Sequence, residues 1–217
     1  MHSLFTSPTS LKVCGITTES DLVGLIDHGV EALGFNFWPQ SKRYIEPSSA
    51  AKFSPDYAGK ILRVGVFVNA VQAEVFSLLD EGVIDVAQLY GDESVEYCQA
   101  FVQRGYAFIK AIGVKNSGSL EHVADYGATA ILLDAHAPDV YGGTGDTFDW
   151  NLALRVMEVN PHLPIMLAGG ITAENAAEAT LRVRPCALDV ASGAESSPGV
   201  KDFTKVAALV AAVESAR

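Results

Sequence analysis

The stretch ILRVGVFVNAVQAEVFSLLDEGVIDVAQLY, residues 61–90, contains one complete structural repeat. It opens with ILRVGVFV (61–68), an apolar, β-branched run typical of a buried strand. A helix is predicted from about Ala70 to Gly82, and IDVAQLY (84–90) is a second buried strand. A strand, a helix and another apolar strand predict a βαβ unit, in which a helical crossover joins two parallel strands.

The same alternation recurs along the rest of the chain. Further strands are predicted at LKVCGI (11–16), EALGFNF (31–37), YAFIKAI (106–112), TAILLDA (129–135), PIMLAGG (164–170) and CALDVASG (186–193). Eight strand–helix units within 217 residues predict an α/β fold, a single-domain (β/α)8 TIM barrel, and favour it over an open doubly wound sheet. No linker divides the chain, so we expect one barrel domain at residues 11–217 after an N-terminal extension at 1–10.

Capping and helix-breaking residues predict where the other helices lie. We expect a helix after Thr17 or Thr18 that ends at Gly29, and a helical piece over 47–59 that Pro47 opens and Pro55 interrupts. A short helix is predicted near 118–126, and others begin near Asp92, Asp149, Thr172 and Val200.

Composition excludes several classes of protein. Hydrophobic residues make up 49% and charged residues 19%, too little charge for a disordered chain or a coiled coil. The net charge of −11 without a basic cluster argues against nucleic acid or an anionic membrane as a partner. The three cysteines form no CxxC pair, which favours a reducing compartment, and the five histidines lack metal-ligand spacing. With no secretory signal and no apolar run of membrane-spanning length, we expect a cytoplasmic protein.

Polar residues at the ends of the predicted strands are the first candidates for function. In a (β/α)8 barrel the active site forms at the carboxyl ends of the strands and in the loops that follow. This rule selects Cys14, Asn36, Gln88, Tyr90, Asp134, Asp189 and Ser192. Asp134 directly follows an apolar run, where an unpaired carboxylate is costly to bury, so it needs a partner or a cleft. Cys14 is a weaker candidate on residue type alone, because a lone cysteine in an apolar strand is more often part of the core.

Glycines gather after the last three strands. The loop AHAPDVYGGTGDTF carries Gly142, Gly143 and Gly145, and a long glycine-rich loop at this face predicts a lid. The next two strands end in LAGGIT and VASGAE, which hold Gly169, Gly170, Ser192 and Gly193. Backbone N–H groups in such turns and at helix N-termini bind phosphate in this fold, so the two turns predict a phosphate site. The alternative is that these glycines only make tight turns.

Seven motifs now stand in order along the chain. They are KVCGIT, FNFWPQSKRYIEP, QLYGDE, LLDA, YGGTGDTFDW, LAGGI and DVASGAE. Together they resemble phosphoribosylanthranilate isomerase, the barrel enzyme of tryptophan biosynthesis, from about Leu11 to the C-terminus. The resemblance implies an Amadori rearrangement of N-(5-phosphoribosyl)anthranilate to 1-(2-carboxyphenylamino)-1-deoxyribulose 5-phosphate.

The resemblance also implies roles for individual residues. By position in the motifs, Asp134 would be the general acid, Cys14 the general base and Arg43 the residue that binds the anthranilate carboxylate. Phosphate would lie on the backbone around Gly169, Gly170, Ser192 and Gly193. A thiol base needs either a pKa below its usual value of about 8.5 or a minor thiolate fraction. The resemblance implies no metal and no organic cofactor.

Two departures from the family pattern stand out. The family more often has histidine where this chain has Tyr90, and lysine where it has Asp146. An acid at the second position is expected to weaken attraction between the lid and an anionic substrate, which would slow the rate without removing the chemistry.

Alternative functions remain open at this point. One alternative is another enzyme of the sugar-phosphate barrel class. A Schiff-base aldolase would use Lys110 in FIKAI. A metal-dependent epimerase would need paired histidines and carboxylates at the strand ends, and these are missing. A barrel that binds a phosphorylated ligand without turning it over is another. One pair of phosphate loops predicts one phosphate, and the sequence is compatible with a monomer or a homodimer.

Overall fold

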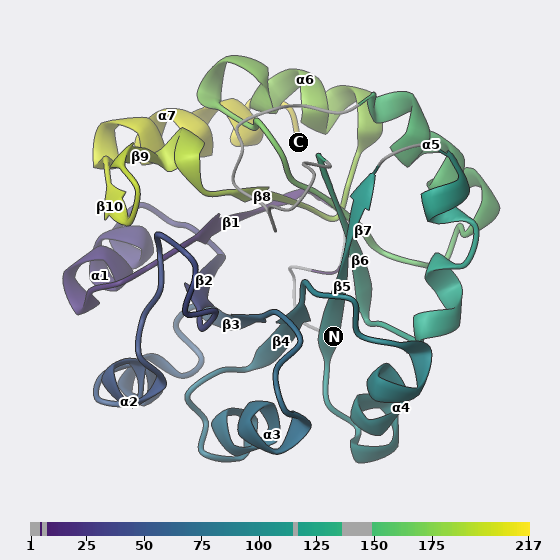
Figure 1. Ribbon diagram of the computed structural model, residues 1–217. Coiled ribbons are helices and arrows are strands. Elements are labelled where there is room, and N and C mark those ends of the chain that lie inside the picture. Colours follow the sequence, from purple (N-terminus) through teal and green to yellow (C-terminus); the bar gives the residue numbers. More distant parts are fainter. Residues whose placement is uncertain (1–4, 6–7, 115–116, 136–148) are drawn as a thin grey trace.

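The computed structural model describes the chain apart from residues 1–4, 6–7, 115–116 and 136–148. Eight parallel strands close into a barrel in sequence order, and β8 pairs with β1 (Figure 1). The strands are β1 (Ser10–Cys14), β2 (Ala32–Asn36), β3 (Leu62–Phe67), β4 (Val86–Leu89), β5 (Phe108–Val114), β6 (Ala130–Ala135), β7 (Ile165–Leu167) and β8 (Ala187–Val190). The predicted (β/α)8 barrel is therefore confirmed.

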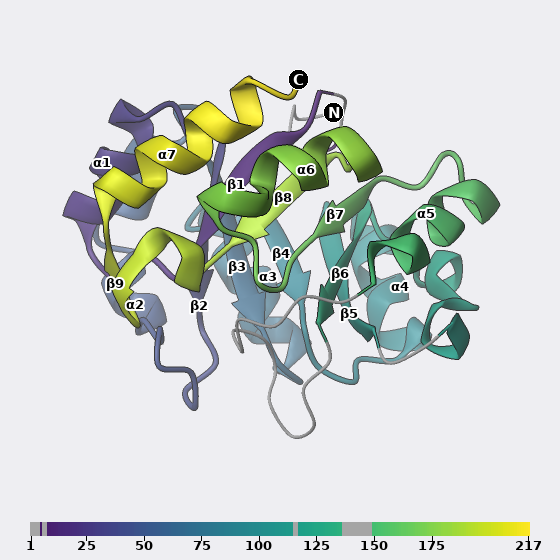
Figure 2. The same cartoon turned by 90° about the horizontal axis from the view of Figure 1, so that it is seen from above.

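Helices surround the barrel, so the strands are covered on their outer face as well (Figures 1 and 2). They are α1 (Glu19–Asp27), α2 (Pro47–Ala50), α3 (Gln72–Asp80), α4 (Val95–Arg104), α5 (Trp150–Val159), α6 (Ala173–Val183) and α7 (Phe203–Glu214). The predicted N-caps Thr18, Asp149 and Thr172 precede α1, α5 and α6. Within the described ranges, no helix combines the length and the apolar character that crossing a membrane requires.

Alternation along each strand divides the buried side chains into two clusters. In β6, Ala130 and Leu132 belong to the cluster inside the barrel, whereas Ile131 and Leu133 pack in the larger cluster beneath the helices. Side chains two residues apart lie on the same face of a strand. The next residue of the inner row is Asp134, so the apolar filling of the barrel gives way to polar groups at the carboxyl ends of the strands.

Part of the predicted N-terminal extension belongs to the barrel. β1 begins at Ser10, one residue before the predicted boundary, and Ser10 pairs with Ala187 of β8. Phe5 is 5% exposed and packs in the inner cluster. The Thr9 hydroxyl donates a hydrogen bond of 2.7 Å to the carbonyl of Pro185.

The piece over 47–59 is interrupted as predicted: it divides into α2 and the 3₁₀ turn η2 (Ser54–Tyr57), which contains Pro55. Two other predicted helices differ in the structure. The stretch 118–126 forms two 3₁₀ turns, η3 (Ser117–Leu120) and η4 (Val123–Tyr126), in place of one helix. The helix predicted near Val200 begins at Phe203, because Asp202 caps the backbone N–H groups of its first turn.

A small hairpin stands where that last helix was expected to begin. β9 (Glu195–Ser197) and β10 (Val200–Lys201) pair antiparallel between the short turn η5 (Ser192–Ala194) and α7. Figure 1 shows the hairpin near α1, at the edge of the barrel. It brings Glu195 and Lys201 back toward the carboxyl end of β1.

Candidate active site

A cavity of about 370 Å³ opens at the carboxyl ends of the strands. Its lining includes all the strand-end residues selected from the sequence: Cys14, Asn36, Gln88, Tyr90, Asp134, Asp189 and Ser192. The loop after β2 contributes Trp38, Gln40, Ser41, Lys42 and Arg43. The barrel therefore places side chains from distant parts of the sequence in one cavity, as the strand-end rule predicted.

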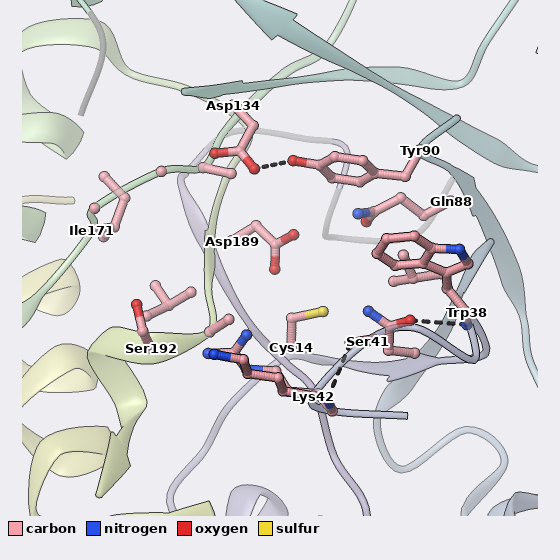
Figure 3. A pocket seen from close by; sticks show the side chains of 18 of the residues that line it. Cys14, Trp38, Ser41, Lys42, Gln88, Tyr90, Asp134, Ile171, Asp189 and Ser192 are labelled. Carbon is pink, nitrogen blue, oxygen red and sulfur yellow. Dashed lines mark hydrogen bonds between the residues drawn. The ribbon is translucent and has the colours of Figure 1, made fainter. Parts of the chain in front are cut away.

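Asp134 and Tyr90 form one wall of this cavity (Figure 3). The Tyr90 hydroxyl donates to Oδ2 of Asp134, and the backbone N–H of Ala135 donates to Oδ1 at 2.7 Å. Burial raises the pKa of Asp134 to about 6, although the hydrogen bond from Tyr90 opposes the rise. This carboxyl group can therefore carry a proton closer to neutral pH than an ordinary aspartate, as a general acid must.

Cys14 lies across the cavity from Asp134, and the carboxylate of Asp189 lies between them (Figure 3). Burial raises the pKa of the Cys14 thiol, Lys12 lowers it and Asp189 raises it, with a net upward shift. A lowered thiol pKa, the first of the two conditions set out for a thiol base, is therefore not met in the free site. The second condition, reaction through a minor thiolate fraction, is the one that fits.

Arg43 lines the cavity, but a carboxylate of this chain already holds its guanidinium. Nε donates to both carboxylate oxygens of Glu195 at 2.9 and 3.0 Å, and Nη2 donates to Oε2 at 2.7 Å. Glu195 also accepts a hydrogen bond of 2.7 Å from Lys201, whose ammonium reaches the carbonyl of Cys14 at 2.5 Å. The guanidinium expected to bind a substrate carboxylate is thus bound to Glu195. Its Nη1 group takes no part in these bonds.

The predicted phosphate residues come from the turns after β7 and β8. Gly169, Gly170 and Ser192 line the main cavity, whereas Gly193 lines a hollow next to it. A Cβ on Gly193 would lie 2.1 Å from the carbonyl oxygen of Ile171, so a glycine is required where the two turns meet. Gly193 therefore fits the tight-turn interpretation, whereas the other three residues face the main cavity.

The first turn of α6 lies beside these residues. Thr172 and Asn175 form a reciprocal capping box, and Asn175 also donates to the carbonyl of Gly170 at 2.8 Å. Among the hydrogen bonds of the described residues, none uses the backbone N–H of Gly170 or Ser192. These donors, next to the positive end of a helix dipole, suit a phosphate group.

The predicted lid lies outside the described residues. Gly142, Gly143 and Gly145 all belong to the segment 136–148, as does Asp146.

Lys110 does not reach the cavity. Its neighbours Ile109 and Ala111 belong to the inner cluster, so Lys110 faces outward, toward the helices. Its ammonium donates to Glu93 at 2.8 Å and to the carbonyls of Leu89 and Gly91 at 3.2 and 2.7 Å. The Schiff-base alternative therefore fails on geometry. In the parts of the chain that the structure describes, no group of three or more His, Cys, Asp or Glu side chains is placed to hold a metal ion.

Three charged residues of the site escaped the sequence reasoning. Lys12 stands two residues before Cys14, and strand periodicity could have placed both on the inner face. Glu195 and Lys201 lie together because of the β9–β10 hairpin, and no hairpin was predicted at that position.

Fold and site together define a class of protein: a (β/α)8-barrel enzyme for acid–base chemistry on a small anionic substrate. The family model described as N-(5'-phosphoribosyl)anthranilate (PRA) isomerase matches residues 11–212. The chain belongs to this family, which confirms the predicted isomerase of tryptophan biosynthesis.

Individual relatives agree with the family match. N-(5'-phosphoribosyl)anthranilate isomerase of Geotalea daltonii is 42% identical over 198 residues, which cover 91% of this chain and 93% of the relative. The crystal structure of phosphoribosyl anthranilate isomerase from Thermus thermophilus superposes with a TM-score of 0.85 at 39% identity, covering 96% of this chain and all of that one. A second structure, 33% identical with a TM-score of 0.82, is of such an isomerase in complex with reduced 1-(o-carboxyphenylamino)-1-deoxyribulose 5-phosphate; the match covers 96% of this chain and 100% of that one.

Proposed function

We propose that this chain converts N-(5-phosphoribosyl)anthranilate to 1-(2-carboxyphenylamino)-1-deoxyribulose 5-phosphate, with Asp134 as the general acid and Cys14 as the general base. One observation carries the assignment of roles. A carboxyl group with a pKa of about 6 and a partly exposed thiol face the same cavity from opposite walls. A rearrangement that adds a proton at one position and removes one at another needs two such groups.

The acid step starts from protonated Asp134. Oδ1 is held by the backbone N–H of Ala135, which leaves Oδ2, beside Tyr90, as the oxygen that gives up the proton. Transfer of this proton to the furanose ring oxygen breaks the C1′–O bond. The anilino nitrogen supplies the electron pair and becomes an iminium.

The base step removes the C2′ proton of that iminium. The thiolate of Cys14 takes the proton, and the C–H electron pair forms the enolamine, which tautomerises to the ketone. The positive iminium acidifies the C2′ proton, so a small thiolate fraction is sufficient for the step.

The two ends of the substrate would bind on either side of the reacting carbons. Its phosphate fits the backbone N–H groups of Gly170 and Ser192, beside α6. Its anthranilate carboxylate would lie near Arg43, where Nη1 remains to meet it while Glu195 holds the rest of the guanidinium. The substrate is a small phosphoribosyl compound, and we propose no metal and no organic cofactor.

A fluorescence assay tests this function. Phosphoribosylanthranilate is generated in place, and loss of anthranilate-type emission is followed after the purified protein is added with EDTA. We expect rapid, EDTA-insensitive decay. No decay with folded protein would leave a phosphate-binding barrel without this activity.

We further propose a cytoplasmic enzyme that works as a monomer or a homodimer. Its three cysteines are all free, which suits a reducing compartment. Sedimentation of the purified chain would measure its oligomeric state.

A further inference from the structure

Lys12 is a buried cation directly beneath the proposed base. It belongs to β1, two residues before Cys14, and its side chain is 0% exposed. The ammonium donates a hydrogen bond of 2.8 Å to Oδ1 of Asp189 on the neighbouring strand β8. Burial disfavours the charged form, but Asp189 and then Cys14 more than compensate, so the pKa of Lys12 lies above its ordinary value. Lys12 therefore stays charged at neutral pH.

The space that holds Lys12 and Cys14 together depends on a glycine. Gly34 of β2 pairs with Cys14, and a Cβ on Gly34 would lie 2.7 Å from Sγ of Cys14 and 3.1 Å from Nζ of Lys12. Both atoms thus converge on one point of the barrel wall. The sulfur and the ammonium are close enough for each to favour the charged form of the other.

A second buried lysine, Lys110, provides a comparison within the same barrel. Lys110 donates to three oxygens, those of Glu93, Leu89 and Gly91. Among the described residues, the ammonium of Lys12 has one oxygen acceptor, Asp189. An ammonium has three donors, and a buried one without enough partners is costly. Lys110 has the partners that a structural cation needs, whereas Lys12 has one carboxylate and a thiol.

Other charges also face Cys14, and their signs can be compared. Asp189 disfavours the thiolate, while Lys201 and Arg43 favour it. The last two are themselves bound to Glu195, which offsets their charge. After burial, Lys12 has the largest effect on the thiol.

We propose that Lys12 is a positioning residue for the isomerase reaction, whose ammonium, held by Asp189, stabilises the thiolate of Cys14. The inference rests on the base role proposed for Cys14. The thiol gives its proton to solvent before the cycle, and the thiolate accepts the C2′ proton. Lys12 itself neither gains nor loses a proton.

The test measures the thiol directly, without substrate. Iodoacetamide alkylation of Cys14 is followed against pH in the intact protein, with the modified peptide identified by mass spectrometry. In Lys12→Met we expect the midpoint of the profile to move up by about one pH unit or more, so that alkylation slows about tenfold at a fixed pH below it. Lys110→Met removes a buried lysine that does not touch Cys14, and it should leave the midpoint unchanged. A midpoint unmoved in folded Lys12→Met would overturn the proposal.

A second variant covers failure to fold and separates the two proposals. Lys12→Met with Asp189→Asn removes both members of the buried pair, a change that proteins often tolerate. The midpoint should still rise, by less than in the single variant, because Lys12 affects the thiol more than Asp189 does; no rise here would also overturn the inference. If Cys14→Ser keeps full turnover, the base role fails, while the alkylation profile still reports whether Lys12 stabilises the thiolate.

Discussion

Gly169, in the turn after β7, makes room for the carboxylate of Asp134 on the neighbouring strand β6. Its backbone has a φ of +82°, and a Cβ there would lie 2.7 Å from Oδ1 of Asp134 and 2.8 Å from the backbone nitrogen of Ala135. A side chain at this position would collide with the carboxylate and with the N–H group that orients it. The glycine predicted to bind phosphate therefore also shapes the acid side of the site.

Substitution of Gly169 should damage both stability and activity. Gly169→Ala adds a steric clash to the cost of a positive φ, which is on the order of 1–3 kcal/mol. Thermal unfolding and kcat would be measured beside Gly59→Ala, where φ is +75° and no atom lies within 4 Å of the added Cβ. The control should lose only the positive-φ cost, on the order of 1–3 kcal/mol, and no activity. Equal effects in the two variants would show that the contact with Asp134 is unimportant.

Removing the Asp134 carboxylate should stabilise the protein at neutral pH. Its pKa of about 6 in the folded state is above the ordinary 3.8, so the folded protein binds this proton more tightly than the unfolded chain. The free energy of unfolding therefore falls as pH rises from about 4 to 6, and it does not fall further above about 6. We expect Asp134→Asn to melt at a higher temperature than the parent at pH 7.5, with the difference shrinking toward pH 4. Asp149→Asn, which keeps an N-cap on α5, is the control; a difference independent of pH would contradict this account.

The hydroxyl of Tyr90 should set the pH at which Asp134 titrates. The hydrogen bond from Tyr90 lowers the pKa of Asp134, so Tyr90→Phe should raise it further. An acid with a higher pKa stays protonated to higher pH, and the limb of the kcat/KM profile that reflects Asp134 should move upward from about 6. Tyr57→Phe, which removes a surface hydrogen bond to Glu19, should leave the profile in place. An unmoved limb in Tyr90→Phe would mean that another group controls it.

Loss of Arg43 should mainly weaken substrate binding. A hydrogen bond to a charged group contributes about 1.5–3 kcal/mol, so Arg43→Ala should raise KM about 10- to 100-fold with a smaller change in kcat. Arg182→Ala removes a surface arginine paired loosely with Glu178 and serves as the matched control. Steady-state kinetics that show an unchanged KM for Arg43→Ala would place the carboxylate site elsewhere.

Local sequence patterns predicted the fold and much of the site for physical reasons. Apolar runs and capping residues are local, so the eight strands and the caps of α1, α5 and α6 could be read from the chain. In a parallel barrel the carboxyl ends of all the strands lie at the same end of the barrel, which explains why Cys14 and Asp134 line one cavity. Contacts between residues far apart in the sequence could not be read in this way, and the binding of Arg43 to Glu195, 152 positions away, is the clearest example.

The pKa of a buried thiol also lies beyond sequence reasoning. Its direction depends on the balance of burial, Lys12 and Asp189 around Cys14. Residue types indicate which groups are present, but only the packing of β1 against β8 decides their separation.

The turnover rate of Asp134→Asn tests the central claim most directly. Asparagine keeps the size of the side chain but has no acidic proton, and general acid catalysis contributes at least about 10²-fold to a rate. In the fluorescence assay with phosphoribosylanthranilate, we expect kcat to fall by about 10²-fold or more in a variant that still folds and binds the product. A kcat within a few-fold of the parent would contradict the assignment of Asp134 as the acid.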